Sequence, residues 1–157
     1  MSKITPFLWF DTQAEEAATF YAAIFPNSRI GEVTRYSEAG PGPSGSAMTV
    51  NFELDGQALT ALNGGPHFRL NEAFSFVIHC QDQAEVDHYW DSLLADGGKA
   101  SQCGWLKDRF GLSWQVVPRQ LGELMTSSEP GVAGRVAKTM MQMVKLDVAK
   151  LEAAARG

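Results

Sequence analysis

The sequence predicts an α+β fold in which a strand, a helix and about three strands form a module that occurs twice, followed by C-terminal helices. Two observations predict it. Strand-like alternation of apolar and polar residues flanks two segments with helical spacing. The order of elements also starts over half-way along the 157 residues. We expect one domain, with module one at about 2–65, module two at about 72–118 and helices at about 119–156.

Module one opens with a strand and a helix. Ile4–Phe10 is a nearly continuous apolar run, and apolar residues recur at helical spacing in Ala14–Phe25. We expect Asp11 or Thr12 to cap this helix, because short polar side chains accept hydrogen bonds from free amides at a helix start. Pro26 ends it.

Three strands complete the module. Arg29–Tyr36, Ser46–Leu54 and Gln57–Leu62 alternate in polarity, and the Asp55-Gly56 turn between the last two predicts a hairpin. The Gly- and Pro-rich stretch Glu38–Gly45 has nothing to pack against in this reading. We expect an inert mobile surface loop there, with a lid as the alternative.

Module two repeats the pattern from Ala73. We expect strands at Phe74–Cys80, Lys99–Leu106 and Leu112–Val117, and an amphipathic helix at Ala84–Leu94 that Gly97-Gly98 ends.

A shift of about 70 residues supports the repeat. It places Gln83-Ala84-Glu85 on Gln13-Ala14-Glu15 and Trp90 on Phe20. Each copy alone leaves one sheet face uncovered, so we expect the two copies to pack together.

Alternation assigns the sheet faces. Leu8, Phe10, Phe74, Phe76 and Ile78 should point to the helices, and Thr5, Phe7, Trp9, Ser75, Val77 and His79 should point the other way. This second set mixes small, polar and aromatic residues. It therefore predicts a concave inner surface for a ligand.

The C-terminal region is predicted to be helical. Gln120–Thr126 forms one helix, a second carries Val132, Val136, Met140, Met143 and Val144 at helical spacing, and Asp147 caps a last short helix. Met140, Met141 and Met143 are interpreted as core or dimer packing; the alternative is an adaptable binding surface.

The composition and the start of the sequence limit the classes of binding partner and the cellular compartment that we expect. The net charge of -5 without a Lys/Arg cluster argues against nucleic acid and anionic membranes. The start lacks a signal-peptide stretch and no apolar run approaches a membrane span, so we expect a cytoplasmic protein. Cys80 and Cys103 are the two cysteines and form no CxxC pair. We interpret both as reduced packing residues.

Several motifs in order resemble one family. They are Ile4-Thr5-Pro6-Phe7-Leu8-Trp9-Phe10, Ala14-Glu15-Glu16-Ala17, Phe20-Tyr21, Ala61-Leu62-Asn63-Gly64-Gly65-Pro66-His67-Phe68, Gly104-Trp105-Leu106-Lys107-Asp108 and Phe110-Gly111-Leu112-Ser113-Trp114-Gln115-Val116-Val117-Pro118. The chain resembles the PhnB-like branch of the vicinal-oxygen-chelate (glyoxalase, bleomycin-resistance and dioxygenase) superfamily, often named 3-demethylubiquinone-9 3-methyltransferase. The resemblance implies paired modules forming a cupped mixed sheet around one small-molecule site, and a homodimer.

Metal-dependent relatives such as glyoxalase I hold a divalent ion with His and Glu at four inner strand positions. The matching positions here are Thr5, Ser75, Gln115 and either Thr60 or Ala61. Neutral hydroxyls and amides are poor ligands for transition metals. A divalent metal is therefore disfavoured, and we predict no cofactor.

A conventional S-adenosylmethionine methyltransferase has a Gly-rich turn after its first strand. Here Asp11-Thr12-Gln13 follows that strand. The methyltransferase name therefore predicts no activity for this chain.

The sequence predicts a largely apolar pocket for a small molecule. Its candidate lining residues are Thr5, Phe7, Trp9, Asn63, Ser75, Val77, Trp105, Ser113 and Gln115. For the aromatic members, plain core packing is the alternative. His67 is the candidate for acid/base work, although a structural role in its loop is the simpler interpretation. Lys107-Asp108-Arg109 is expected to be a solvated turn, with Lys107 a candidate contact for an anion.

Three functions stay open. The first is a small-molecule-binding protein, including one that sequesters a drug, and the second is a metabolic enzyme with lyase-, oxygenase- or transferase-like chemistry. The third is a purely structural or protein-binding role for the C-terminal helices.

Overall fold

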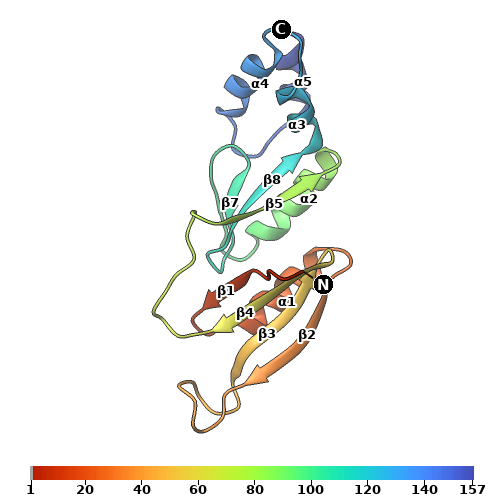
Figure 1. Cartoon of the computed structure of the whole chain (residues 1–157). Helices are drawn as coiled ribbons and strands as arrows, with labels where there is room; N and C mark the ends of the chain where they lie inside the picture. The colour runs from red at the N-terminus through yellow and green to blue at the C-terminus, as the bar shows by residue number, and fades with distance from the viewer. Residues whose placement is uncertain (1) are drawn as a thin grey trace. The chain divides into compact units, whose positions relative to one another are not determined.

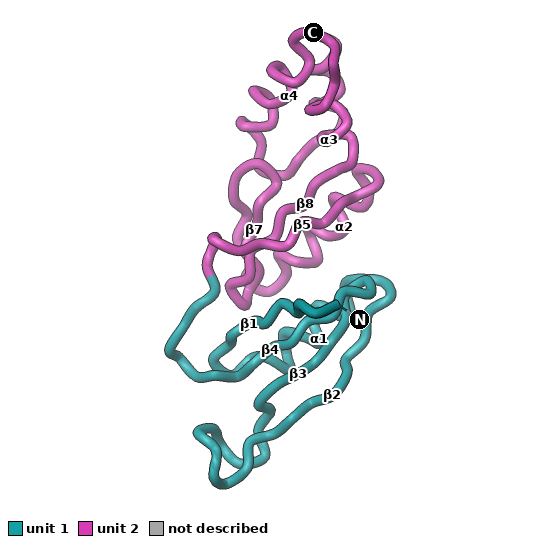
Figure 2. The backbone as a smooth tube through the Cα atoms, viewed as in Figure 1, with its two compact units in different colours: residues 1–70 teal, residues 71–157 magenta. Residues whose placement is uncertain are grey.

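The computed structural model describes residues 2–157. The chain divides into two compact units, residues 1–70 and residues 71–157 (Figures 1 and 2). Each unit contains one four-stranded mixed sheet and one long helix, and the second unit also contains the C-terminal helices. The predicted fold class, α+β with two strand–helix–three-strand modules, is confirmed.

Unit 1 follows the predicted order closely. Its elements are β1 (Phe7–Phe10), α1 (Ala14–Ile24), β2 (Arg29–Arg35), β3 (Ala47–Leu54) and β4 (Gln57–Asn63). The strand order is β1-β4-β3-β2, with β1 parallel to β4 and the other neighbours antiparallel. The hairpin between β3 and β4 turns at Asp55 and Gly56, both with positive φ, as this two-residue turn requires.

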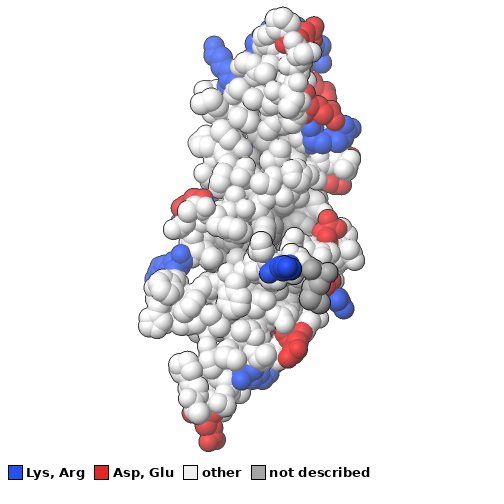
Figure 3. All heavy atoms as spheres, viewed as in Figure 1, with Lys and Arg blue, Asp and Glu red and all other residues white. Residues whose placement is uncertain are grey.

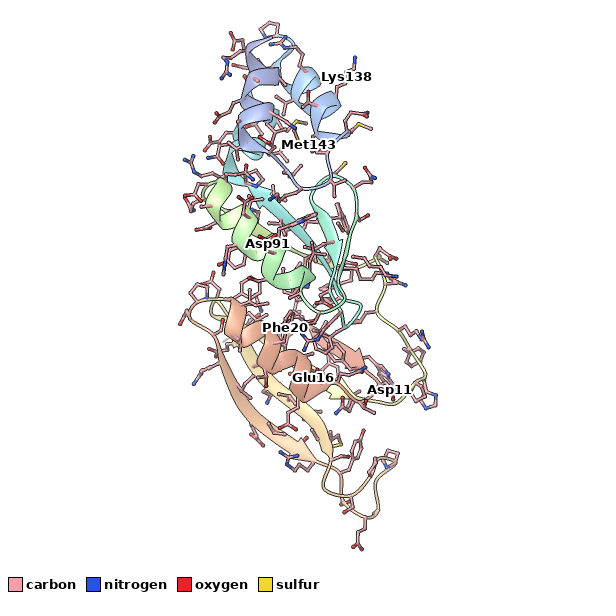
Figure 4. The ribbon with its side chains drawn as sticks, turned by 180° about the vertical axis from the view of Figure 1, so that it is seen from behind. Asp11, Glu16, Phe20, Asp91, Lys138 and Met143 are labelled. Atoms are coloured by element: carbon pink, nitrogen blue, oxygen red, sulfur yellow. The ribbon has the colours of Figure 1, made fainter. Side chains whose placement is uncertain are left out.

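Helix α1 covers one face of this sheet, and Figure 4 shows it in front of the strands with Glu16 and Phe20 labelled. Leu8, Phe10 and Tyr21 are buried between helix and sheet, whereas Phe7 is 58% exposed. The predicted alternation of β1 is therefore confirmed. In each unit we call the side of the sheet opposite its long helix (α1 or the second unit's 83–94 helix) the helix-free face; in unit 1 this face carries Phe7.

The start of α1 is not capped as predicted. Neither Asp11 nor Thr12 caps it, and the N-cap residue Gln13 makes no side-chain cap bond. Instead, Asn63 at the end of β4 accepts a hydrogen bond from the Ala14 amide at 2.8 Å. The cap comes from a residue that the fold, and not the local sequence, brings to the helix.

The 38–45 loop has a packing partner that the sequence analysis missed. The Tyr36 ring lies where a Cβ on Gly42 would be, and the Gly45 amide donates to the Tyr36 carbonyl. The Tyr36 hydroxyl donates to the Asn63 carbonyl at 2.5 Å. Tyr36 thus ties the loop to the end of β4, and the expectation that nothing packs there was wrong.

Unit 2 repeats the topology, but β6 and β7 have only two and three residues. Its elements are β5 (Ser75–Cys80), α2 (Gln83–Leu94), β6 (Lys99–Ala100), β7 (Trp105–Lys107) and β8 (Ser113–Pro118), in the order β5-β8-β7-β6 with β5 parallel to β8. The single strand predicted at 99–106 is two strands. Cys103 and Gly104 both have positive φ and form a turn between them.

The repeat is confirmed with one correction to its alignment. The N-cap residues are Gln13 in α1 and Asp82 in α2, so the helices match at a shift of one residue less than the strands. Buried Trp90 therefore corresponds to buried Tyr21, and not to partly exposed Phe20. The connection from strand to helix is one residue longer in module one.

Three helices follow β8. They are α3 (Arg119–Met125), α4 (Val132–Met140) and α5 (Val148–Arg156). Asp147 caps α5 by accepting from the Lys150 amide, as predicted. Helix α4 ends at Met140, earlier than expected, and Met143 lies in the following turn segment.

The C-terminal helices have a core of their own. It contains Leu121, Val132, Val136, Met143, Leu146 and Leu151. Core packing of the methionines is confirmed for Met143 and for Met140, which packs against this cluster, whereas Met141 is 64% exposed.

Within residues 2–157, no helix is long and apolar enough to cross a membrane. Both cysteines are free, and Cys80 is buried. On the face shown in Figure 3, Lys and Arg side chains are interspersed with Asp and Glu side chains.

Candidate functional site

The helix-free face of the second sheet gathers five of the nine predicted ligand-binding residues. Strand register aligns Ser75, Ser113 and Lys107 in one row across β5, β8 and β7, and Val77, Gln115 and Trp105 in the next. Paired residues project to the same side of a sheet. Trp114 and Val116, between these positions, are buried on the α2 side.

Two pairs of polar groups involve this face. The Gln115 Nε2 donates to Ser75 Oγ at 3.0 Å, and Lys107 forms an ion pair with Glu72. The Ser113 hydroxyl is buried and has no hydrogen-bond partner within the described part of the chain. Such a group in a folded protein calls for an explanation, and a ligand or water is one.

The Lys107-Asp108-Arg109 turn is only partly solvated, because its central residue is buried, and this corrects the prediction. Asp108 is 3% exposed. Its Oδ1 accepts from the Phe110 and Leu112 amides at 2.9 and 3.1 Å, and its Oδ2 accepts from Trp114 Nε1 at 2.8 Å. The carboxylate holds the turn that joins β7 to β8.

The equivalent face of unit 1 contains a hollow of about 670 Å³. Its lining includes Thr5, Asn51 and Thr60. Thr60 Oγ1 donates to Asn51 Oδ1 at 2.8 Å. At the rim, Arg29 and Glu53 form a two-bond ion pair at 3.1 Å each. This pair lowers the pKa of Glu53, through the hydrogen bond from Arg29.

The register of the strands decides between Thr60 and Ala61 as the fourth inner position. Thr60 pairs with Phe7 in β1, as Gln115 pairs with Val77 in β5. Ala61 is fully buried on the α1 side. Thr60 is therefore the counterpart of Gln115, and the alternative Ala61 is excluded.

Asn51 was missed by the sequence analysis, although a signal existed. Counting outward from the Asp55-Gly56 turn places Asn51 opposite Thr60.

Two other candidates have structural partners. Trp9 Nε1 donates to the Gly65 carbonyl at 2.9 Å and its ring meets Phe68 edge-on. Both amide atoms of Asn63 are engaged, with Ala14 and Ala47. These contacts give Trp9 and Asn63 a role in shaping the end of module one. His67 is exposed on the segment after β4.

The family model described as 3-demethylubiquinone-9 3-methyltransferase matches residues 2–117. The chain belongs to this family. It thereby joins the PhnB-like proteins of the glyoxalase/bleomycin-resistance superfamily, as the sequence motifs predicted.

Solved structures agree with the family assignment. A Bacillus cereus protein provisionally described as 3-demethylubiquinone-9 3-methyltransferase, PhnB protein, is 33% identical over 74% of this chain and 99% of its own, with a TM-score of 0.69. The protein PA1353 from Pseudomonas aeruginosa is 21% identical over 75% and 98%, with a TM-score of 0.61. The fosfomycin resistance protein FosX from Listeria monocytogenes shares the fold at 13% identity over 75% and 93%, with a TM-score of 0.52. No curated protein matches.

The superfamily's divalent metal does not fit the residues at the inner positions. Thr5, Thr60, Ser75 and Gln115 are neutral, and three of them already bond to protein partners. Residues 2–157 contain no group of three or more His, Cys, Asp or Glu side chains placed to hold a metal ion. Such a site would have only weak, uncharged donors to replace the hydration of the ion.

S-adenosylmethionine, implied by the family name, does not fit the turn after β1 either. In a methyltransferase of the doubly wound type, a Gly-rich turn and free helix amides receive the cofactor. Here the turn is Asp11-Thr12-Gln13, and the first α1 amide is bonded by Asn63.

Proposed function

We propose that this PhnB-like protein binds an uncharged small molecule on the helix-free sheet faces, without a divalent metal. The observation that carries the proposal is the Gln115–Ser75 pair at 3.0 Å. On the alignment given above, this amide and hydroxyl take the positions of His or Glu ligands in metal-dependent relatives. An amide and a hydroxyl together offer donors and acceptors to a ligand, and neither requires a compensating charge.

The chemistry of the faces suggests the ligand class. Each face has apolar or aromatic surface: Phe7 in unit 1, which is 58% exposed, and Val77 and Trp105 in unit 2, where Val77 is 42% exposed. Each unit also has a cation that a glutamate neutralises, Arg29 in unit 1 and Lys107 in unit 2. A flat, uncharged molecule with a hydrogen-bonding edge satisfies these groups best.

The binding proposal is tested by NMR titration of the purified protein with benzamide and with catechol, two uncharged aromatic probes. We expect chemical-shift changes to concentrate on β5, β7 and β8 and on the helix-free face of β4. Gln115→Leu should weaken binding about 10-fold or more, because it removes hydrogen bonds to the probe and leaves the Ser75 hydroxyl without its partner. Thr60→Val tests the face of unit 1 in the same way.

Matched controls use the same substitutions away from these faces. Gln13→Leu and Thr19→Val change exposed positions at the start and on the surface of α1, and should leave probe binding unchanged. Uniform weak shifts without saturation, or equal effects of the control substitutions, would refute the proposal.

A further inference from the structure

The segment between α4 and α5, residues 141–147, pairs with the turn that precedes Trp105. The Met143 carbonyl accepts from the Cys103 amide and the Val144 carbonyl accepts from the Gly104 amide, both at 2.8 Å. Figure 4 labels Met143 where this segment leaves the C-terminal helices. We call residues 141–147 the brace. The brace lies beyond the 2–117 span that the family model matches.

Gly104 joins the brace to the sheet. Its carbonyl accepts from the Val116 amide of β8 at 2.8 Å. Its φ of +85° belongs to the left-handed region, and a Cβ there would lie 3.0 Å from the Leu146 side chain. The turn is thus held by β8 on one side and by the brace on the other, directly before Trp105.

Gln83 of α2 forms hydrogen bonds to the brace and to the first residue of α5. The Gln83 Nε2 donates to the Leu146 carbonyl at 3.1 Å and to Asp87 Oδ1 at 3.0 Å, and its Oε1 accepts from the Val148 amide at 2.7 Å. Lys145 adds an ion pair to Asp87 at 2.8 Å. Hydrogen bonds from Lys145 and Gln83 lower the pKa of Asp87.

Gln83 and Lys145 make polar contacts between the brace and α2, and the space beside them is partly open to solvent. A hollow of about 690 Å³ lies along it, lined by Gln83, Asp87, Lys145 and other residues of 142–152. On the other side of the brace, Met143 and Leu146 are buried in the core of the C-terminal helices. The brace therefore belongs by packing to those helices, and directional polar bonds attach it to α2.

We propose that the C-terminal helices position Trp105 on the helix-free face through the brace, with Gln83 as the positioning residue that fastens it. Gln83 bonds to Asp87, Leu146 and Val148, and it acts on Trp105 through the Cys103-Gly104 turn. The consequence for ligand binding rests on the proposed function, whereas the effect on the turn does not.

Hydrogen exchange and NMR of Gln83→Met test the proposal on the full chain. Methionine keeps much of the side-chain length but offers no comparable hydrogen bonds. We expect the Cys103 and Gly104 amides to exchange about 10-fold faster or more, and the Trp105 indole resonance to shift. Benzamide binding should weaken in parallel. Lys145→Met, which removes only the ion pair, should give a smaller change in the same direction.

The control is Gln13→Met, which changes an exposed glutamine at the start of the other helix. It should leave exchange at the turn unchanged. Unchanged protection of Cys103 and Gly104 in Gln83→Met would overturn the brace. Faster exchange and a shifted Trp105 resonance in a protein that binds neither benzamide nor catechol would support the brace and reject the proposed function.

Discussion

Replacing Asp108 tests whether a buried carboxylate holds the β7–β8 turn. Asp108→Ala removes three hydrogen bonds, from the Phe110 and Leu112 amides and from Trp114 Nε1. Trp114 and Leu112 are 2% and 1% exposed, so water cannot readily replace the lost acceptor. A hydrogen bond to a charged group contributes roughly 1.5–3 kcal/mol, and neighbouring bonds are not additive. We expect a loss of about 3–5 kcal/mol in the free energy of unfolding.

Urea unfolding followed by circular dichroism measures this loss. Asp108→Asn should cost less than Asp108→Ala, because its oxygen still accepts from the two amides while its amide nitrogen faces the Trp114 donor. The control is Asp11→Ala, at an exposed side chain without a positive φ, which should change stability by about 0.5 kcal/mol or less. A loss below about 1 kcal/mol for Asp108→Ala would refute the role of the carboxylate.

Three further predictions follow from single residues. Gly104→Ala should destabilise the protein by about 1–3 kcal/mol in urea unfolding, because a positive φ and a close neighbour both oppose a Cβ; a neutral effect would contradict the geometry of the turn. Asn63→Ala should cost about 1–2 kcal/mol through the lost cap on α1, and Asn63→Asp should recover part of it, since a carboxylate still accepts from the Ala14 amide. Burial raises the pKa of Cys80 to about 12, so at pH 8 this thiol stays protonated and iodoacetamide should modify Cys103 alone until the protein is unfolded; rapid labelling of both would contradict the burial.

Local patterns predicted most of the fold. The alternation around Phe7 and Val77, the Asp55-Gly56 turn and the Asp147 cap each depend on residues close together in the chain, and each is confirmed. The same locality explains the failures. The α1 cap comes from Asn63, 49 residues away from Ala14, which no local pattern reveals.

The candidate site was predicted in outline. Alternation placed Ser75, Val77 and Gln115 on one face, and the register confirms that they share it. Asp108 looked solvated because it stands between two cations in the sequence, yet it folds back onto Trp114. Periodicity assigns a residue to a face of its own strand but does not identify its partner on another element.

The most direct test of the central claim is a calorimetric titration of chelator-treated protein with nickel, zinc, manganese and iron(II). Neutral groups at Thr5, Thr60, Ser75 and Gln115 predict no stoichiometric binding of any of these ions, and benzamide affinity that is unchanged by EDTA. Tight binding at one ion per chain that Gln115→Leu or Thr60→Val abolishes would contradict the metal-free site, and would place the protein among the metal-dependent members of its superfamily.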